Sequence, residues 1–137
     1  MEFISAKEFS NQPKEVQEVL MEWWKPQQYD LYLCDNKTLE ITLRSDDDLI
    51  LPIRSNSVWD EKARCIPLFT EGQLRKFIEN KTRKILFIDF EKIDGKLNYS
   101  IYLFQDNDRY ENYDNLGYDL IQAYWQVACE IAKGEIK

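Results

Sequence analysis

The stretch Lys84–Gln105 constrains the fold most strongly, because it consists of two apolar runs joined by Asp94 and Gly95. An Asp-Gly pair between apolar runs is a strong hairpin signal, since both central residues of such a turn must tolerate positive φ. The first run, Ile85–Ile88, is unbroken, which predicts a central strand that is covered on both faces or nearly so. In the second run, apolar side chains alternate along one face, at Leu97, Tyr99, Ile101 and Leu103.

The remaining segments predict helices and strands that cover or extend this hairpin. Ser5 with Glu8, and Thr70 with Gln73, have the spacing of helix-capping boxes. Apolar residues at helical spacing predict helices over Pro13–Trp24 and Tyr118–Lys133, the second of them packed on the sheet. The predicted fold class is therefore α+β, with one antiparallel sheet of about five strands and three to four helices. The further strands are predicted at Tyr29–Cys34, Leu39–Leu43 and Leu49–Ile53.

Composition limits the class of protein. A chain of 137 residues with 44% apolar content fits a single domain over residues 1–137. The net charge of −7 argues against direct binding to nucleic acid or to an anionic membrane, because both need a basic surface. The sequence contains neither a secretory signal nor a membrane span, which predicts a cytoplasmic protein with reduced thiols at its three cysteines.

No catalytic or cofactor signature is present. The chain has no histidine, the commonest general base and transition-metal ligand, and its four glycines form no phosphate-binding loop. Asp89 and Glu91 share one face of a strand and leave a carboxylate-based enzyme open as a third possibility. Asp106, Asp108 and Glu111 do not match a calcium loop, because the glycine and the bidentate glutamate that such a loop needs are missing. We therefore predict no enzyme, no cofactor and no metal.

The segment Asp106–Gly117 combines acidic residues with tyrosines, and its composition predicts a polar loop. Tyrosine offers a large contact area at low entropic cost, so this segment is the candidate partner-binding surface. Its candidate contact residues are Asp106, Asp108, Tyr110, Glu111, Tyr113 and Asp114.

A second possibility is a pocket that sequesters a nucleotide signal. A tryptophan can stack on a base, and arginine or lysine side chains can pair with its phosphates. The candidate residues for this alternative are Arg54, Trp59, Arg64, Arg75 and Lys76.

Three segments resemble small uncharacterised proteins carried by phages and prophages of Gram-positive bacteria. They are Glu15–Pro26, Pro67–Ile78 and Leu120–Ala132, and the last is similar to the helix of phage sandwich domains that layer helices on an antiparallel sheet. The resemblance implies a role in phage–host conflict or phage regulation. It favours a binding protein that inhibits a host protein, such as an anti-CRISPR acting on a nucleic-acid-binding defence complex.

Overall fold

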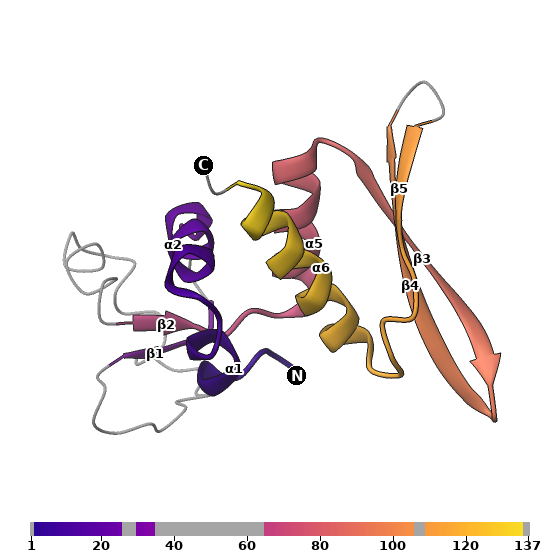
Figure 1. The fold of residues 1–137 in the computed structure, drawn as a ribbon. Helices are drawn as coiled ribbons and strands as arrows, with labels where there is room; N and C mark the ends of the chain where they lie inside the picture. Colours follow the sequence, from indigo (N-terminus) through magenta and orange to yellow (C-terminus); the bar gives the residue numbers. More distant parts are fainter. Residues whose placement is uncertain (1, 26–29, 35–64, 106–108, 136–137) are drawn as a thin grey trace. The chain divides into compact units, whose positions relative to one another are not determined.

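The computed structural model describes residues 2–25, 30–34, 65–105 and 109–135 of the chain (Figure 1). Its fold class is α+β, as the sequence predicts. No described helix has the length and apolar character needed to cross a membrane. In order, the elements are α1 (Ala6–Ser10), α2 (Lys14–Trp23), β1 (Tyr32–Cys34), β2 (Cys65–Pro67), α5 (Glu71–Thr82), β3 (Ile85–Ile93), β4 (Lys96–Gln105), β5 (Arg109–Tyr113) and α6 (Leu120–Gly134).

The chain divides into two compact units: the first is Ser5–Phe69, and the second comprises Met1–Ile4 and Thr70–Lys137. In the first unit, the predicted capping box of Ser5 and Glu8 starts α1. Aromatic rings form much of its core: the ring centroids of Phe9 and Trp23 each lie 6.3 Å from that of Phe69. The Trp24 side chain is buried and donates a hydrogen bond from its indole Nε1 to Asp30 Oδ2, 3.1 Å away.

The described strands do not form one sheet of about five strands. They form a two-stranded pair, β1 with β2, and a separate three-stranded sheet in the order β3-β4-β5. Strand β1 pairs antiparallel with β2, so that Cys34 lies opposite Cys65. The two predicted strands at Leu39–Leu43 and Leu49–Ile53 lie outside the described residues.

The second unit layers α5 and α6 on one face of the three-stranded sheet (Figure 1). The predicted capping box starts α5, since Thr70 Oγ1 accepts from the Gln73 N–H and the Gln73 side chain accepts from the Thr70 N–H. Helix α6 contacts both α5 and β4, as predicted for the C-terminal helix. The core between these layers includes Phe77, Leu86, Ile101, Leu103 and Val127, which are almost fully buried.

Strands β3 and β4 pair antiparallel along their whole length, with Ile93 opposite Lys96. Asp94 and Gly95 connect them with φ values of 51° and 81°. Two successive residues with positive φ match the right-handed twist of the strands on either side, and only small or turn-forming residues adopt that conformation at low cost. The turn therefore fixes which β3 residues share a face with which β4 residues.

Part of the segment predicted to be a polar loop is a strand. Arg109–Tyr113 forms β5 and pairs with β4, with Glu111 opposite Leu103 and Tyr113 opposite Ile101. The polar composition of this segment does not indicate a strand, because an edge strand needs few apolar residues when a neighbouring strand supplies the buried surface. After β5 the backbone rejoins β4, where the Leu116 N–H donates to the Tyr99 carbonyl and the Tyr99 N–H donates to the Gly117 carbonyl, both at 2.9 Å.

Asn98 holds this return of the chain, and its amide side chain is buried. Its Nδ2 donates to Asn115 Oδ1 at 3.1 Å, and its Oδ1 accepts from the Gly117 N–H at 3.2 Å. Asn115 and Gly117 both have positive φ, so the backbone conformation here depends on being held in place.

We expect Asn98→Ala to lower the free energy of unfolding by about 1–3 kcal/mol, because it leaves the Gly117 N–H without its acceptor. Urea denaturation followed by circular dichroism measures the loss. Asn112→Ala is the matched control, since Asn112 makes an exposed hydrogen bond to Asp114 and its loss should change stability by less than about 0.5 kcal/mol. Equal effects of the two substitutions would contradict the role assigned to Asn98.

Candidate protein-binding surface

The outward face of β3 is exposed. The prediction that Ile85–Ile88 is covered on both faces is wrong, because only Leu86 is buried in this run while Ile85 and Phe87 are 54% and 53% exposed. The register explains the difference. Leu86 lies opposite Leu103 on the face that the helices cover, whereas Phe87 lies opposite Tyr102 on the other face.

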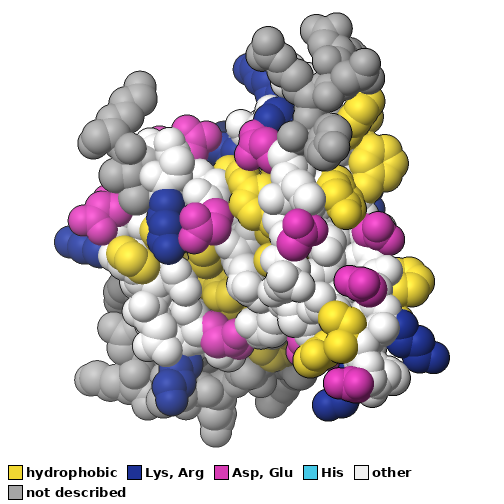
Figure 2. Space-filling view, turned by 45° about the vertical axis from the view of Figure 1, so that its right-hand side comes forward, with side chains coloured by type: hydrophobic (Ala, Val, Ile, Leu, Met, Phe, Trp, Pro, Cys, Tyr) yellow, Lys and Arg dark blue, Asp and Glu magenta, His cyan; other side chains and the backbone are white. Residues whose placement is uncertain are grey.

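Aromatic and aliphatic side chains from β3 and β4 meet on this outward face. The Phe87 ring packs edge-on against the Phe104 ring, with 6.3 Å between centroids. Ile85 lies opposite Phe104 in the register, and Tyr102 and Phe104 are half-buried. Figure 2 turns the side that carries the sheet toward the viewer and shows hydrophobic side chains open to solvent with carboxylates among them. We call Ile85, Phe87, Tyr102 and Phe104 the outer apolar cluster.

Two carboxylates continue this face toward the hairpin turn. Asp89 and Glu91 follow Phe87 at alternate positions of β3, and both are exposed. Asp89 Oδ1 accepts a hydrogen bond from the Phe90 N–H at 2.8 Å. No cluster of three or more metal-ligating side chains occurs in the described part of the chain. The two carboxylates place negative charge next to the outer apolar cluster, and a catalytic role for them stays an untested alternative.

The free edge of β3 is closed at one position by α5. The Leu86 N–H donates to Glu79 Oε2, and the Leu86 carbonyl accepts from Arg75 Nη2, both at 3.0 Å. Arg75 and Glu79 also form an ion pair one helical turn apart, with 3.6 Å between Nε and Oε1. Outward-facing backbone groups alternate along an edge strand, so those of Ile88, Phe90 and Lys92 point the same way as those of Leu86.

The segment predicted as the partner-binding surface is engaged within the protein at two of its positions. Glu111 forms an ion pair with Lys84, and this hydrogen-bonded cation lowers the pKa of the Glu111 carboxyl against the opposing effect of burial. The Tyr113 hydroxyl donates to Glu111 Oε2 at 3.2 Å. Burial, with the Glu111 charge adding to it, raises the pKa of Tyr113 to about 12.

The other predicted contact residues are less connected. Asp114 is exposed and accepts a hydrogen bond from Asn112 Nδ2. The backbone of Tyr110 lies opposite that of Phe104, and Asp106 and Asp108 lie outside the described residues. The structure thus brings Glu111 and Tyr113 together, while the six residues as one binding surface stay a prediction.

Of the residues predicted for nucleotide binding, Arg54, Trp59 and Arg64 lie outside the described residues. Arg75 and Lys76 are exposed on α5. The Arg75 guanidinium is already engaged by Leu86 and Glu79, so it supports the sheet edge. Nucleotide binding stays a prediction without a described pocket to support it.

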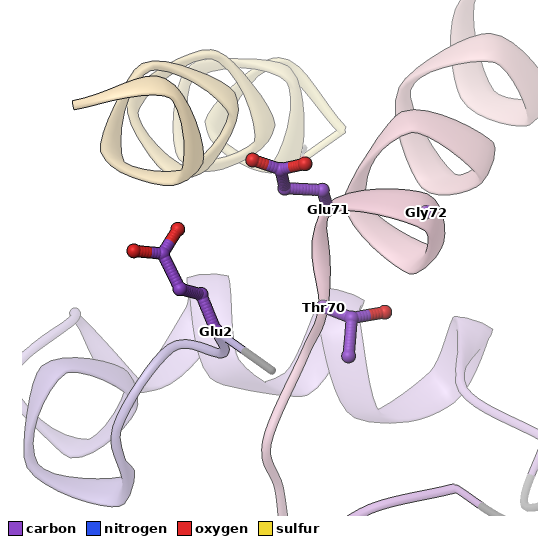
Figure 3. A pocket seen from close by; sticks show the side chains of 4 residues that line it. All are labelled: Glu2, Thr70, Glu71 and Gly72. Atoms are coloured by element: carbon purple, nitrogen blue, oxygen red, sulfur yellow. The ribbon is translucent and has the colours of Figure 1, made fainter.

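A shallow cavity of about 290 Å³ lies at the start of α5, lined by Glu2, Thr70, Glu71 and Gly72. The carboxylates of Glu2 and Glu71 extend toward the same open space, while the Thr70 hydroxyl points to the other side (Figure 3). Ligand pockets combine apolar walls with a few convergent polar groups. Here the only charged groups are two carboxylates, and the one hydroxyl points away from them, so no set of convergent polar groups is present and we assign no site.

The sequence does not predict the outer apolar cluster. It also does not predict that Arg75, a candidate for nucleotide binding, supports the sheet edge together with Glu79. A signal for the outer apolar cluster was present, since Tyr102 and Phe104 alternate with the buried residues of β4. Comparison with known proteins adds no assignment: no protein-family model, no curated protein and no solved structure matches this chain.

Proposed function

We propose that this chain is a non-enzymatic binding protein that docks on another protein and inhibits or modulates it. The observation that carries the proposal is the outer apolar cluster, which leaves Ile85 and Phe87 more than half exposed on an open sheet face. Exposed aromatic and aliphatic side chains that adjoin one another mark interaction surfaces more often than single exposed residues do. Aromatic residues are also enriched at the centre of protein interfaces.

The acidic surroundings suggest the kind of partner. Asp89 and Glu91 follow the cluster on β3, and the acidic segment that begins at Asp106 follows β4 in sequence. An acidic surface can compete for a site that evolved to bind nucleic-acid phosphate. With the resemblance to phage-encoded proteins, this favours a host protein in the bacterial cytoplasm, such as a nucleic-acid-binding defence complex, and an anti-CRISPR-like role.

The test is quantitative capture from extracts of a Gram-positive host by the immobilised chain. We expect a host protein at near-stoichiometric yield with the native sequence, and a loss of at least about tenfold with Phe87→Asp, which places a charge in the interface core. Yield should also fall as salt rises, because salt screens the carboxylates.

Asn80→Asp is the matched control, since it adds the same charge at an exposed position of α5. It should capture as much as the native chain. If Phe87→Asp captures the same protein equally well, the outer apolar cluster is not the binding surface. The alternative variant replaces the six predicted contact residues of Asp106–Gly117, its four carboxylates by amides and its two tyrosines by alanine. If this variant loses capture instead, the binding surface lies on that segment.

A further inference from the structure

We propose that the partner adds a β-strand to the free edge of β3, and that this strand is an extended segment with two basic residues at alternate positions between apolar ones. The proposal rests on the proposed function and specifies the chemistry of the partner. Strand β3 is an edge of the described sheet.

The backbone groups on this edge are used unequally. At Leu86 the N–H and the C=O are both hydrogen-bonded to side chains of α5. At Phe90 the N–H donates to the Asp89 side chain. Within the described part of the chain, the edge-facing groups of Ile88 and Lys92 have no hydrogen-bond partner. A long edge with unpaired N–H and C=O groups is a template for another strand, and native proteins usually block it.

The block at Leu86 therefore sets where an added strand must stop. Arg75 and Glu79 occupy the edge at that residue, so the available stretch runs from Phe87 to Ile93. Its side chains are accessible as well: Phe90 is 58% exposed and Ile93 is 37% exposed. Strand addition gains affinity from main-chain hydrogen bonds and specificity from alternate side chains.

The side chains on the outer face define the partner. Phe87, Asp89, Glu91 and Ile93 succeed one another on that face, in the order apolar, acidic, acidic, apolar. An added antiparallel strand places one residue opposite each of them, with Cβ atoms about 4.5–5.5 Å apart. Basic residues opposite Asp89 and Glu91, and apolar residues opposite Phe87 and Ile93, complete this pattern.

The same charges argue against a second copy of this chain as the occupant. Antiparallel pairing of two β3 strands through Ile88 and Lys92 centres on Phe90, which places Asp89 of each copy opposite Glu91 of the other. Like charges directly opposite each other destabilise a strand pair. A partner of opposite charge removes that penalty, and Asp89 becomes free to pair when the incoming strand takes over the Phe90 N–H.

The test uses a blocked peptide of seven residues with valine at positions 1 and 7, arginine at 3 and 5, and threonine elsewhere. Nuclear magnetic resonance hydrogen exchange should show new protection at the amides of Ile88 and Lys92. The amides of Asp89 and Glu91 should not change, because their backbone groups already face β4. This alternation distinguishes strand addition from docking on the sheet face.

Affinity from fluorescence anisotropy supplies the second readout. The double variant Asp89→Asn with Glu91→Gln should bind the peptide about tenfold more weakly at low salt, since two cross-strand ion pairs are lost. The double variant Glu130→Gln with Glu135→Gln removes the same charge from the C-terminal end of the chain and should bind normally. A peptide with glutamate in place of arginine should not bind.

Uniform protection, no protection, or equal affinity of both double variants would overturn the proposal. So would protection of Ile88 and Lys92 that grows with protein concentration without peptide, because the occupant would then be a second copy. If host-protein capture still depends on Phe87 while the alternation is absent, strand addition fails and the proposed function stands. If host-protein capture does not depend on Phe87, the outer apolar cluster is not the binding surface, and the proposed function loses its main support.

Discussion

Phe77→Ala should lower the free energy of unfolding by about 3–5 kcal/mol, the largest effect on stability that we expect from one substitution. Phe77 is fully buried on α5, the helix that packs on both α6 and β3. Its removal loses the transfer free energy of the ring and leaves a cavity that the two helices and the sheet cannot fully close. The free energy of unfolding of a domain of this size is about 5–15 kcal/mol in total, so the variant would keep little of its stability.

Urea denaturation followed by far-ultraviolet circular dichroism measures this effect. Asn80→Ala is the control on the same helix, at an exposed position where the change should stay within about 0.5 kcal/mol. A loss below about 1 kcal/mol for Phe77→Ala would mean that α5 does not pack on the sheet and α6 as described.

The parts of the fold that the sequence predicts correctly are those specified by neighbouring residues. Both capping boxes are present, at Ser5 and Thr70, because each needs only residues three positions apart. The C-terminal helix follows from its apolar stripe, and its first N–H groups are capped by Asp119 Oδ1. Local chemistry decides these features before any distant contact forms.

The pairings of β1 with β2 and of β4 with β5 join residues that are further apart, and the sequence does not predict them. Strand β1 pairs with β2, more than thirty positions later, and nothing in either three-residue segment specifies the other. Strand β5 carries mostly polar residues and is fixed by its pairing to β4 and by the Asn98 side chain. A single sequence contains no signal for such partners when both segments are short.

The candidate site shows a different limit. An unbroken apolar run such as Ile85–Ile88 indicates a strand, but the sequence cannot tell a strand buried on both faces from one that presents a binding face. The structure distinguishes them, because the helices cover the face of Leu86 and leave that of Phe87 open. Composition favours the segment Asp106–Gly117 as a binding surface, but it does not indicate the ion pair between Glu111 and Lys84, which are distant in sequence.

Thiol chemistry should show the second large effect, at Cys129. Burial raises the pKa of its thiol to about 12, a shift that Lys133 opposes and Glu130 increases. The thiolate is the reactive form, so at pH 8 the folded protein should react with iodoacetamide at least about 1,000-fold more slowly than the unfolded chain. The measurement uses a variant with Cys34→Ser and Cys65→Ser, in which Cys129 is the only thiol.

The same shift makes stability depend on alkaline pH. The unfolded thiol loses its proton near pH 9 and the folded thiol only near pH 12, so the unfolded state binds fewer protons between these values. Stability contributed by the neutral thiol is therefore fully present below pH 9 and is lost as pH rises toward 12. Tyr113 also lowers stability as pH rises above 10, because its pKa is raised from 10 to about 12 in the folded state.

The substitution Cys129→Ala separates the contribution of the Cys129 thiol to alkaline destabilisation from that of the Tyr113 hydroxyl. Its free energy of unfolding should fall less steeply between pH 9 and pH 10 than that of the native chain, while the decline above pH 10 from Tyr113 persists. Labelling of the single-thiol variant in concentrated guanidinium chloride gives the unfolded rate for comparison. A native labelling rate within tenfold of that rate would show that the face of α6 that carries Cys129 is open to solvent, and the packing of α6 would then need revision.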